Sequence, residues 1–280
     1  NSKPKVLTMF EPELSKDYSR VFLHEPTLRY NSAVENIYQI GGYYGLTSKY
    51  YGTLFSIYQE PDGFIHPSSP ILDILGVRYI FTTRTLPELN SIEAKVVAST
   101  PVKEEDYGRF MSPNGIRTPI GNLVYVYENI DRLPRAYLVG KVERAENDEE
   151  AVTKMKEKDL KNTAIIVSNN ELPLTNDDQD TSSTTIEKYQ SSYIKINAKS
   201  NGRSLLVLSD AYYPGWKVYV DGKENFIHRT NMSLRGVYLE DGQHVVEFRY
   251  VPNALYIGGI ISIASLLAIG LALFRHRRAL

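Results

Sequence analysis

The chain has 280 residues, a formal net charge of −1 at pH 7 and no cysteine. A net charge this close to zero creates no long-range field, which excludes partners that depend on one, nucleic acid in particular. The absence of cysteine excludes disulfides and thiol chemistry, so a domain outside the cytoplasm must rely on its own hydrophobic core. The bias towards tyrosine, 21 against 9 phenylalanines, is typical of sugar-binding surfaces and also of plain strand faces.

The first part of the chain predicts short elements separated by loops. We expect a strand at residues 21–23 and an amphipathic helix at residues 49–59, where aromatic and leucine residues recur at helical spacing. A second, shorter helix is expected between Ser69, which is a typical N-cap, and Gly76, which is a typical terminator. A strand rich in β-branched and aromatic residues follows at residues 77–83.

Residues 41–45 read Gly-Gly-Tyr-Tyr-Gly. Glycine at three of these positions permits a positive φ or a close backbone approach. One interpretation is a tight turn with packed rings. The other is a loop that lies against a membrane-embedded partner or its substrate, which makes Tyr43 and Tyr44 candidate substrate-binding residues.

Residues 123–168 predict an α/β layer. Strands are expected at residues 123–128, 136–142 and 164–168. A helix should begin after Asn147, because this residue is a typical N-cap and a glutamate follows three positions later. Strand, helix and strand in this order are typical of layered α/β structure.

A polar stretch at residues 169–192 predicts a linker. After it, apolar and polar residues alternate at 194–199 and again at 245–250, which predicts strands with one buried face. Residues 205–208 are all apolar and predict a strand that is covered on both faces. The pattern is therefore all β from residue 193 onwards.

Two Asp-Gly pairs, at residues 221–222 and 241–242, lie between such strands. Asp-Gly between alternating runs is a strong signal for a β-hairpin, so two hairpins are expected. Short strands with turns at this spacing indicate a β-sandwich at residues 193–252.

An uncharged apolar run occupies residues 254–274. As a helix it would be about 31 Å long, close to the thickness of a bilayer core. The basic cluster at residues 275–278 follows at once and marks the cytoplasmic side of a membrane span. We therefore expect the lipid bilayer as a partner, residues 1–252 outside the cytoplasm and the C-terminus inside. The alternative, a buried helix of a soluble domain, fits the length of the run and the abrupt basic stop less well.

These patterns predict an α+β chain in five parts. The start of the chain does not resemble a signal peptide, so we expect upstream transmembrane helices of the same polypeptide to deliver residues 1–252 across the membrane. The five parts are a mixed α/β extracytoplasmic domain at residues 1–168, a polar linker at 169–192, the β-sandwich at 193–252, a transmembrane helix at 253–274 and a basic cytoplasmic tail at 275–280.

The strongest candidate binding site is an aromatic group with one carboxylate: Tyr212, Tyr213, Trp216 and Tyr219, together with Asp210. Aromatic faces stack on sugar rings, and a carboxylate accepts hydrogen bonds from sugar hydroxyls. The structural alternative is that residues 214–215 form a turn and that Trp216 fills the core of the sandwich.

Other chemistry finds little support. A glycosidase needs two carboxylates at a set separation, and of the candidates Asp210, Asp221 and Asp241, the last two belong to the predicted turns. The five histidines share no metal-ligand spacing, and no glycine-rich phosphate-binding loop is present. The sequence predicts no metal and no cofactor.

The stretch at residues 209–223, SDAYYPGWKVYVDGK, strongly resembles the C-terminal extracytoplasmic domain of the YfhO family of bacterial membrane proteins. Proteins of this family look like GT-C-type glycosyltransferases. The resemblance continues at residues 41–44, 68–79, 133–137 and 244–252, and in the apolar run that follows.

The resemblance implies transfer of a sugar from a polyprenyl-phosphate donor to a cell-envelope acceptor outside the cytoplasm. Such enzymes carry their catalytic carboxylate in an early loop among many transmembrane helices, and no residue of this sequence matches it. We therefore predict no catalytic residue here and interpret the chain as the non-catalytic outer part of a transferase. The alternative is a single-span surface protein whose β-sandwich binds a glycan or a protein.

Overall fold

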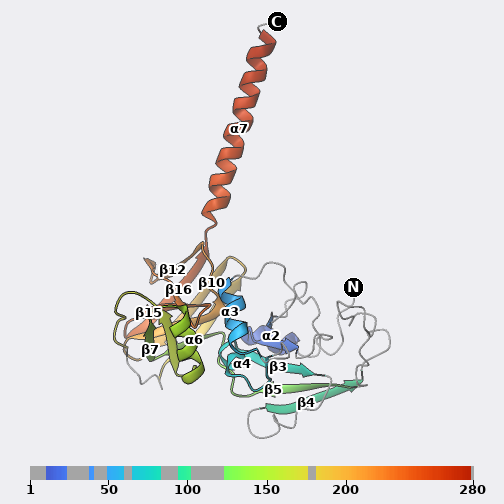
Figure 1. Ribbon diagram of the computed structural model, residues 1–280, viewed down its shortest axis with the longest axis vertical. Coiled ribbons are helices and arrows are strands. Elements are labelled where there is room, and N and C mark those ends of the chain that lie inside the picture. The colour runs from blue at the N-terminus through green and yellow to red at the C-terminus, as the bar shows by residue number, and fades with distance from the viewer. Residues whose placement is uncertain are drawn as a thin grey trace.

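The computed structural model describes residues 11–23, 38–40, 49–59, 65–82, 94–101, 123–175 and 181–278. Over these residues the chain is rich in sheet, with a few helices and a long C-terminal helix that projects from the rest of the molecule (Figure 1). The glycine-rich loop with Tyr43 and Tyr44 lies outside the described residues.

The first sheet has the strand order β2-β1-β3-β5-β4 and lies far from the projecting helix (Figure 1). β1 is parallel to β2 and β3, whereas β5 is antiparallel to β3 and β4. The strands expected at residues 21–23, 77–83 and 123–128 are all present in it. Its strands are β1 (Arg20–Leu23), β2 (Tyr38–Ile40), β3 (Val77–Thr82), β4 (Ala94–Pro101) and β5 (Leu123–Asn129).

The helices of this part are α2 (Glu11–Asp17), α3 (Lys49–Ile57) and α4 (Pro70–Ile74). α3 and α4 confirm the two predicted helices. Ser69 occupies the N-cap position of α4, but within the described residues its hydroxyl makes no capping hydrogen bond. Gly76 follows α4 with a φ of +66°, and a Cβ there would lie 3.1 Å from the carbonyl oxygen of Leu133. Glycine therefore permits residues 133–135 to pass close to the end of α4.

The other two sheets share a hydrophobic core, and we call them together the two-sheet unit. Their strand orders are β6-β11-β15-β14-β8-β7 and β13-β12-β16-β10-β9. Ile196 and Phe248 belong to the five-stranded sheet of this unit. They pack with Leu206 and Val237 of its six-stranded sheet. The strands are β6 (Ala136–Val139), β7 (Lys141–Ala145), β8 (Thr163–Val167), β9 (Ser183–Gln190), β10 (Tyr193–Ser200), β11 (Ser204–Ala211), β12 (Trp216–Val220), β13 (Lys223–Asn225), β14 (His228–Thr230), β15 (Leu234–Leu239) and β16 (Gly242–Tyr250).

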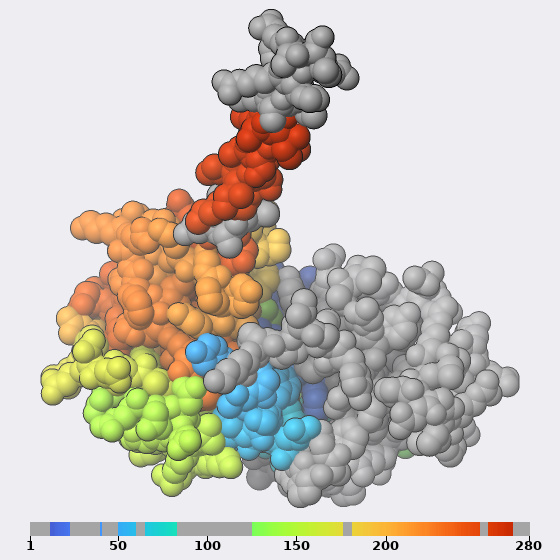
Figure 2. All heavy atoms as spheres, turned by 45° about the horizontal axis from the view of Figure 1, so that its top comes forward, coloured from blue at the N-terminus to red at the C-terminus, as the bar shows by residue number. Residues whose placement is uncertain are grey.

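The six-stranded sheet is covered on both faces, as the apolar run at residues 205–208 predicts. Leu206 and Leu208 of β11 face the other sheet of the two-sheet unit, which contains β10 and β16. Leu205 and Val207 belong to the other core, which also contains Leu54 of α3 and residues of α4 and β3. In Figure 2 the residues of α3 and α6, light blue and green, lie on the side of the two-sheet unit away from the C-terminal helix.

The predicted helix after Asn147 is α6 (Asp148–Glu157). The Oδ1 atom of Asn147 accepts a hydrogen bond from the backbone N–H of Glu150 at 2.9 Å, which confirms the predicted cap. α6 connects the parallel strands β7 and β8, so the expected strand, helix and strand order is present. The strand predicted at residues 136–142 is divided into β6 and β7.

The two-sheet unit extends across the boundaries that the sequence predicts for the linker, at residues 168 and 193. β6, β7 and β8 precede the predicted linker and belong to the same sheet as β11 and β15. β9 lies inside the predicted linker, at the edge of the five-stranded sheet. Its polar composition has a physical reason, because one face of this edge strand is solvated while Ile186 and Tyr189 pack on the core.

The two Asp-Gly pairs have different roles. Asp221 and Gly222, with φ values of +51° and +79°, form the predicted hairpin turn between β12 and β13. The second predicted hairpin is wrong, because β15 and β16 belong to different sheets. Gly242, with a φ of +115°, instead lies where the chain crosses from one sheet to the other.

The C-terminal helix α7 (Asn253–Arg278) follows β16 after Val251 and Pro252. The side chains described in it are those of residues 257–270. In the part of the chain that the structure describes, no helix combines the length and apolarity needed to cross a membrane. The large apolar side chains of α7 that are more than half exposed are Ile257, Ile260, Ile261, Ile263, Leu266, Leu267 and Ile269.

Candidate functional site

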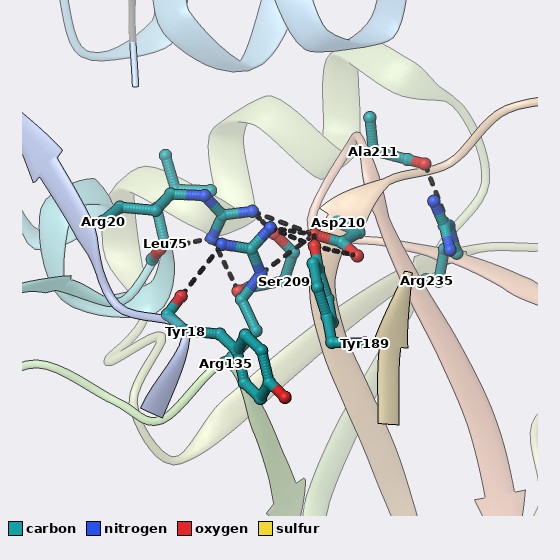
Figure 3. A network of polar contacts seen from close by, with 9 residues as sticks. All are labelled: Tyr18, Arg20, Leu75, Arg135, Tyr189, Ser209, Asp210, Ala211 and Arg235. Atoms are coloured by element: carbon teal, nitrogen blue, oxygen red, sulfur yellow. Dashed lines mark hydrogen bonds and ion pairs between the residues drawn. The ribbon is translucent and has the colours of Figure 1, made fainter. Parts of the chain in front are cut away.

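The candidate site is built around Asp210, near the end of β11, whose side chain is largely buried. Arg20 donates to its Oδ1 atom at 3.0 Å, and Arg135 donates to the same atom at 2.7 and 3.0 Å. The Tyr189 hydroxyl lies 2.9 Å from Oδ2 and 3.0 Å from Oδ1. Figure 3 shows both guanidinium groups and the tyrosine converging on this one carboxylate.

The two arginines also tie Asp210 to the N-terminal part of the chain. Arg20 donates to the carbonyl oxygen of Leu75 and to Ser209. Arg135 donates to the carbonyl oxygen of Tyr18 at 3.1 Å. The segments at residues 68–79, 133–137 and 209–223, which carry the family resemblance, therefore meet at this network (Figure 3).

The charges of this cluster set its protonation states. Burial alone would raise the pKa of Asp210, but the surrounding arginines, above all Arg135, hold it well below its ordinary value. Burial and the neighbouring charge of Arg135 lower the pKa of Arg20 to about 10. Burial and the charge of Asp210 raise the pKa of Tyr189. At neutral pH Asp210 is therefore an anion and Tyr189 is a neutral hydrogen-bond donor.

A partly open cleft of about 530 Å³ lies next to Asp210. This volume is within the range of small-molecule sites in proteins. Among the described residues, Asp210 is the one carboxylate that lines it. The lining residues are Tyr189, Gln190, Ser191, Ile194, Asp210, Ala211, Trp216 and Arg235.

Arg235, in β15, is 5 % exposed and lies on the other side of Asp210 from Arg20 and Arg135 (Figure 3). Its Nε atom donates to the carbonyl oxygen of Ala211 at 3.0 Å. Its Nη1 atom is buried and has no hydrogen-bond partner among the described residues. The guanidinium carbon lies 3.8 Å from the centre of the Trp216 ring, which is a cation–π contact.

Trp216 begins β12 and is half-buried against the core of the two-sheet unit. Its ring lies 5.5 Å from that of Tyr250, the last residue of β16. Gly215 before it has a φ of +100°, and a Cβ there would lie 2.9 Å from the Tyr250 ring. The Pro-Gly turn therefore brings the indole close to the start of α7.

The structure brings only part of the predicted binding group together. Asp210 and Trp216 both line the cleft. Tyr212 packs against the core, and Tyr213, 53 % exposed, is not among the lining residues. Oδ1 of Asp210 already accepts hydrogen bonds from both arginines, whereas Oδ2 accepts one among the described residues, from Tyr189. The role of Asp210 as an acceptor for sugar hydroxyls stays a prediction. Trp216 has part of each predicted role, since it packs on the core and also lines the cleft.

Four residues of the site were not predicted: Arg20, Arg135, Tyr189 and Arg235. The sequence does contain a signal for Arg235, because it alternates with Val237 and Leu239, which both face the core. An arginine at an inward position of a strand must be paired or must line a site. Tyr189 was missed because it lies in the stretch predicted as a linker.

Neither hydrolysis nor metal binding gains support from the geometry. Asp221 accepts hydrogen bonds from Val245 and His244 at a turn, apart from Asp210. Asp241 accepts one from the backbone of Gly202. Among the described residues, no group of histidine and carboxylate side chains is arranged to hold a metal ion.

Residues 125–262 match the model of a protein family described as bacterial membrane protein YfhO. Over these residues the chain belongs to the YfhO family. The YfhO region contains the whole lining of the cleft as well as Arg135, and it extends into α7. No curated protein and no solved structure matches the chain.

Proposed function

We propose that this chain is the non-catalytic extracytoplasmic part of a polytopic membrane glycosyltransferase. The enzyme would transfer a sugar from a polyprenyl-phosphate donor to a cell-envelope acceptor. The observation that carries the proposal is the match of residues 125–262 to a family of bacterial membrane proteins. This region contains the cleft and continues into α7, so one unit combines a ligand-sized cavity with a helix of apolar surface.

In this proposal residues 254–274 cross the bilayer, and upstream helices of the same polypeptide supply the remaining spans. The run is uncharged, and the apolar side chains described in it are exposed to solvent, which is costly unless lipid or protein covers them. The basic residues at 275–278 then lie in the cytoplasm and residues 1–252 lie outside it.

The site supports a binding role more than a catalytic one. Transfer to an acceptor hydroxyl needs a base that can take up a proton. Asp210 is the single carboxylate among the described lining residues, and its lowered pKa and its bonds to two arginines make it a poor proton acceptor. The catalytic base would therefore come from another part of the polypeptide, in agreement with the early acidic loop that the family resemblance implies.

A comparison of cell-envelope polymers from cells with and without the intact protein tests the proposal. We expect one sugar to disappear from a polymer when the gene is deleted and to return with the wild-type gene. An unchanged sugar composition would contradict the transferase role.

The half-exposed Trp216 beside an open cleft also favours the alternative of a surface protein that binds a glycan. The same deletion distinguishes the two. A glycan-binding protein would leave the sugar composition unchanged, while the purified chain would bind isolated envelope polymer.

A further inference from the structure

The Nη1 atom of Arg235 is buried and has no hydrogen-bond partner among the described residues, which needs an explanation. A buried N–H group that loses water without gaining a partner is costly, and native proteins rarely leave one unexplained. Arg235 is held by Ala211 on one side and by the face of Trp216 on the other. Neither contact uses Nη1, and Arg235 lines the cleft.

The charges around the cleft favour an anion. Within the described residues, the buried cluster contains the cations Arg20, Arg135 and Arg235 and the single anion Asp210. Two of the arginines bind Asp210 directly, whereas the described hydrogen bonds of Arg235 do not include that carboxylate. Burial lowers the pKa of Arg235, which reflects the cost of keeping this charge away from water. A bound anion would offset that cost.

The position of the cleft indicates where the anion comes from. Trp216 pairs with Tyr250, and the backbone N–H of Val251 donates to the carbonyl oxygen of Gly215 at 2.7 Å. The turn after β9 contributes Ser191 to the lining, and its neighbour Ser192 accepts from the N–H of Tyr250. The cleft therefore lies at the end of the two-sheet unit where β16 leads into α7. Figure 1 shows α7 leaving the unit at its last strand.

We propose that the cleft is a phosphate site in which Arg235 binds a phosphate group next to Trp216. Guanidinium groups bind phosphate oxygens through charge-assisted hydrogen bonds, and Arg is better suited to this than Lys. If α7 enters the bilayer, which rests on the proposed function, the cleft faces the membrane surface and a lipid headgroup supplies the phosphate. The phosphate site itself depends only on Arg235, Trp216 and the cleft.

The emission of Trp216 gives a direct assay, because it is the one tryptophan of the chain. We would titrate the purified full chain in a neutral detergent with inorganic phosphate, and separately with short-chain phosphatidic acid and the matching diacylglycerol. We expect a saturable change with phosphatidic acid and none with diacylglycerol. A saturable change with inorganic phosphate alone would support the site with a soluble phosphate compound as its source.

Arg235→Gln should weaken this binding by about tenfold or more, because a charged hydrogen bond is lost. Arg249→Gln is the matched control, since it removes a charge from the same end of the unit but lies on the Tyr219 ring and pairs with Glu247. It should leave binding within about twofold, as expected for an exposed pair. If Arg235→Gln fails to fold, Arg235→Lys, assayed by calorimetry, should show a smaller loss in the same direction, because Lys keeps the charge but not the planar guanidinium.

The proposal is overturned if neither phosphate compound binds, or if folded variants at Arg235 bind as the wild type does. This readout does not depend on sugar transfer. An unchanged envelope composition in the deletion strain would contradict the proposed function and leave the phosphate site standing. A changed envelope composition together with no phosphate binding by the purified chain would contradict the phosphate site and leave the proposed function standing.

Discussion

At the scale of single residues, Asp210 is the carboxylate that pairs with two buried arginines. It neutralises Arg20 and Arg135, which are both buried and come from other parts of the chain. Removing one member of a buried ion pair leaves the other charge uncompensated, which costs more than the pair itself contributes.

Asp210→Asn should therefore lower the free energy of unfolding by about 3–5 kcal/mol. Urea denaturation of the purified chain measures this value. Glu171→Gln, at an exposed position, is the control and should change stability by less than about 0.5 kcal/mol. Equal stability of Asp210→Asn and the wild type would show that the arginines find other partners.

The pH dependence of stability tests the same network. The pKa of Asp210 is lower in the folded state than in the unfolded state, where it is about 3.9. Its contribution is therefore complete above the unfolded pKa and is lost as the pH falls towards the folded value.

We expect the stability difference between the wild type and Asp210→Asn to be constant above about pH 5 and to shrink below about pH 4. Denaturation curves of both proteins across this range measure it. A difference that grows as the pH falls would have the wrong sign for a carboxylate stabilised by Arg20, Arg135, Arg235 and Tyr189.

The sequence contained part of this residue-scale information. Arg235 occupies an inward position of a strand pattern, so its burial was readable from alternation. The partners of Asp210 were not readable in the same way. Arg20 lies 190 positions before it in the chain, and the local sequence around either residue does not indicate that the two are in contact.

At the scale of elements, the turn before β12 is the feature that fixes the indole against Tyr250. Gly215 adopts a φ that L side chains rarely adopt, and the Tyr250 ring and the carbonyl oxygen of Val251 occupy the space of a Cβ. Gly222 also has a positive φ but has open space around it. A substitution at Gly222 therefore tests backbone strain alone, whereas one at Gly215 tests strain together with crowding against Tyr250.

Gly222→Ala should cost about 1 kcal/mol from strain alone. Gly215→Ala should cost more, about 3 kcal/mol, because crowding against Tyr250 adds to the strain. Thermal unfolding of the two variants compares them directly. Equal losses would mean that the Tyr250 ring moves aside without cost.

Elements with a clear period were predictable, and elements at edges and corners were not. α3, α4 and α6 and the strands with alternating residues follow their sequence patterns. β9 did not, because a solvated edge strand has the polar composition of a linker. The Asp-Gly pair at residues 241–242 permits a turn, but whether the strands it joins share a sheet depends on which partners β16 finds elsewhere.

At the scale of the whole molecule, the two-sheet unit connects the other parts. One of its faces packs on α3, α4 and the first sheet, while α7 continues directly from its last strand (Figures 1 and 2). The predicted domain limits failed to capture this, because β6, β7 and β8 enter a sheet whose remaining strands follow residue 200. Sheet membership is set by contacts between distant segments, which local composition does not record.

The orientation of the chain in the membrane is the most direct test of the central claim. Since the chain has no cysteine, single cysteines introduced into it have no background from its own residues, and the same intact protein without them is the control. We would place Lys223→Cys, at an exposed position of β13, and separately Ala279→Cys, in the intact protein and treat cells with a maleimide that does not cross membranes. We expect labelling of Lys223→Cys in intact cells and of Ala279→Cys only after permeabilisation. Labelling of Ala279→Cys in intact cells, or protection of Lys223→Cys until the cells are opened, would contradict it.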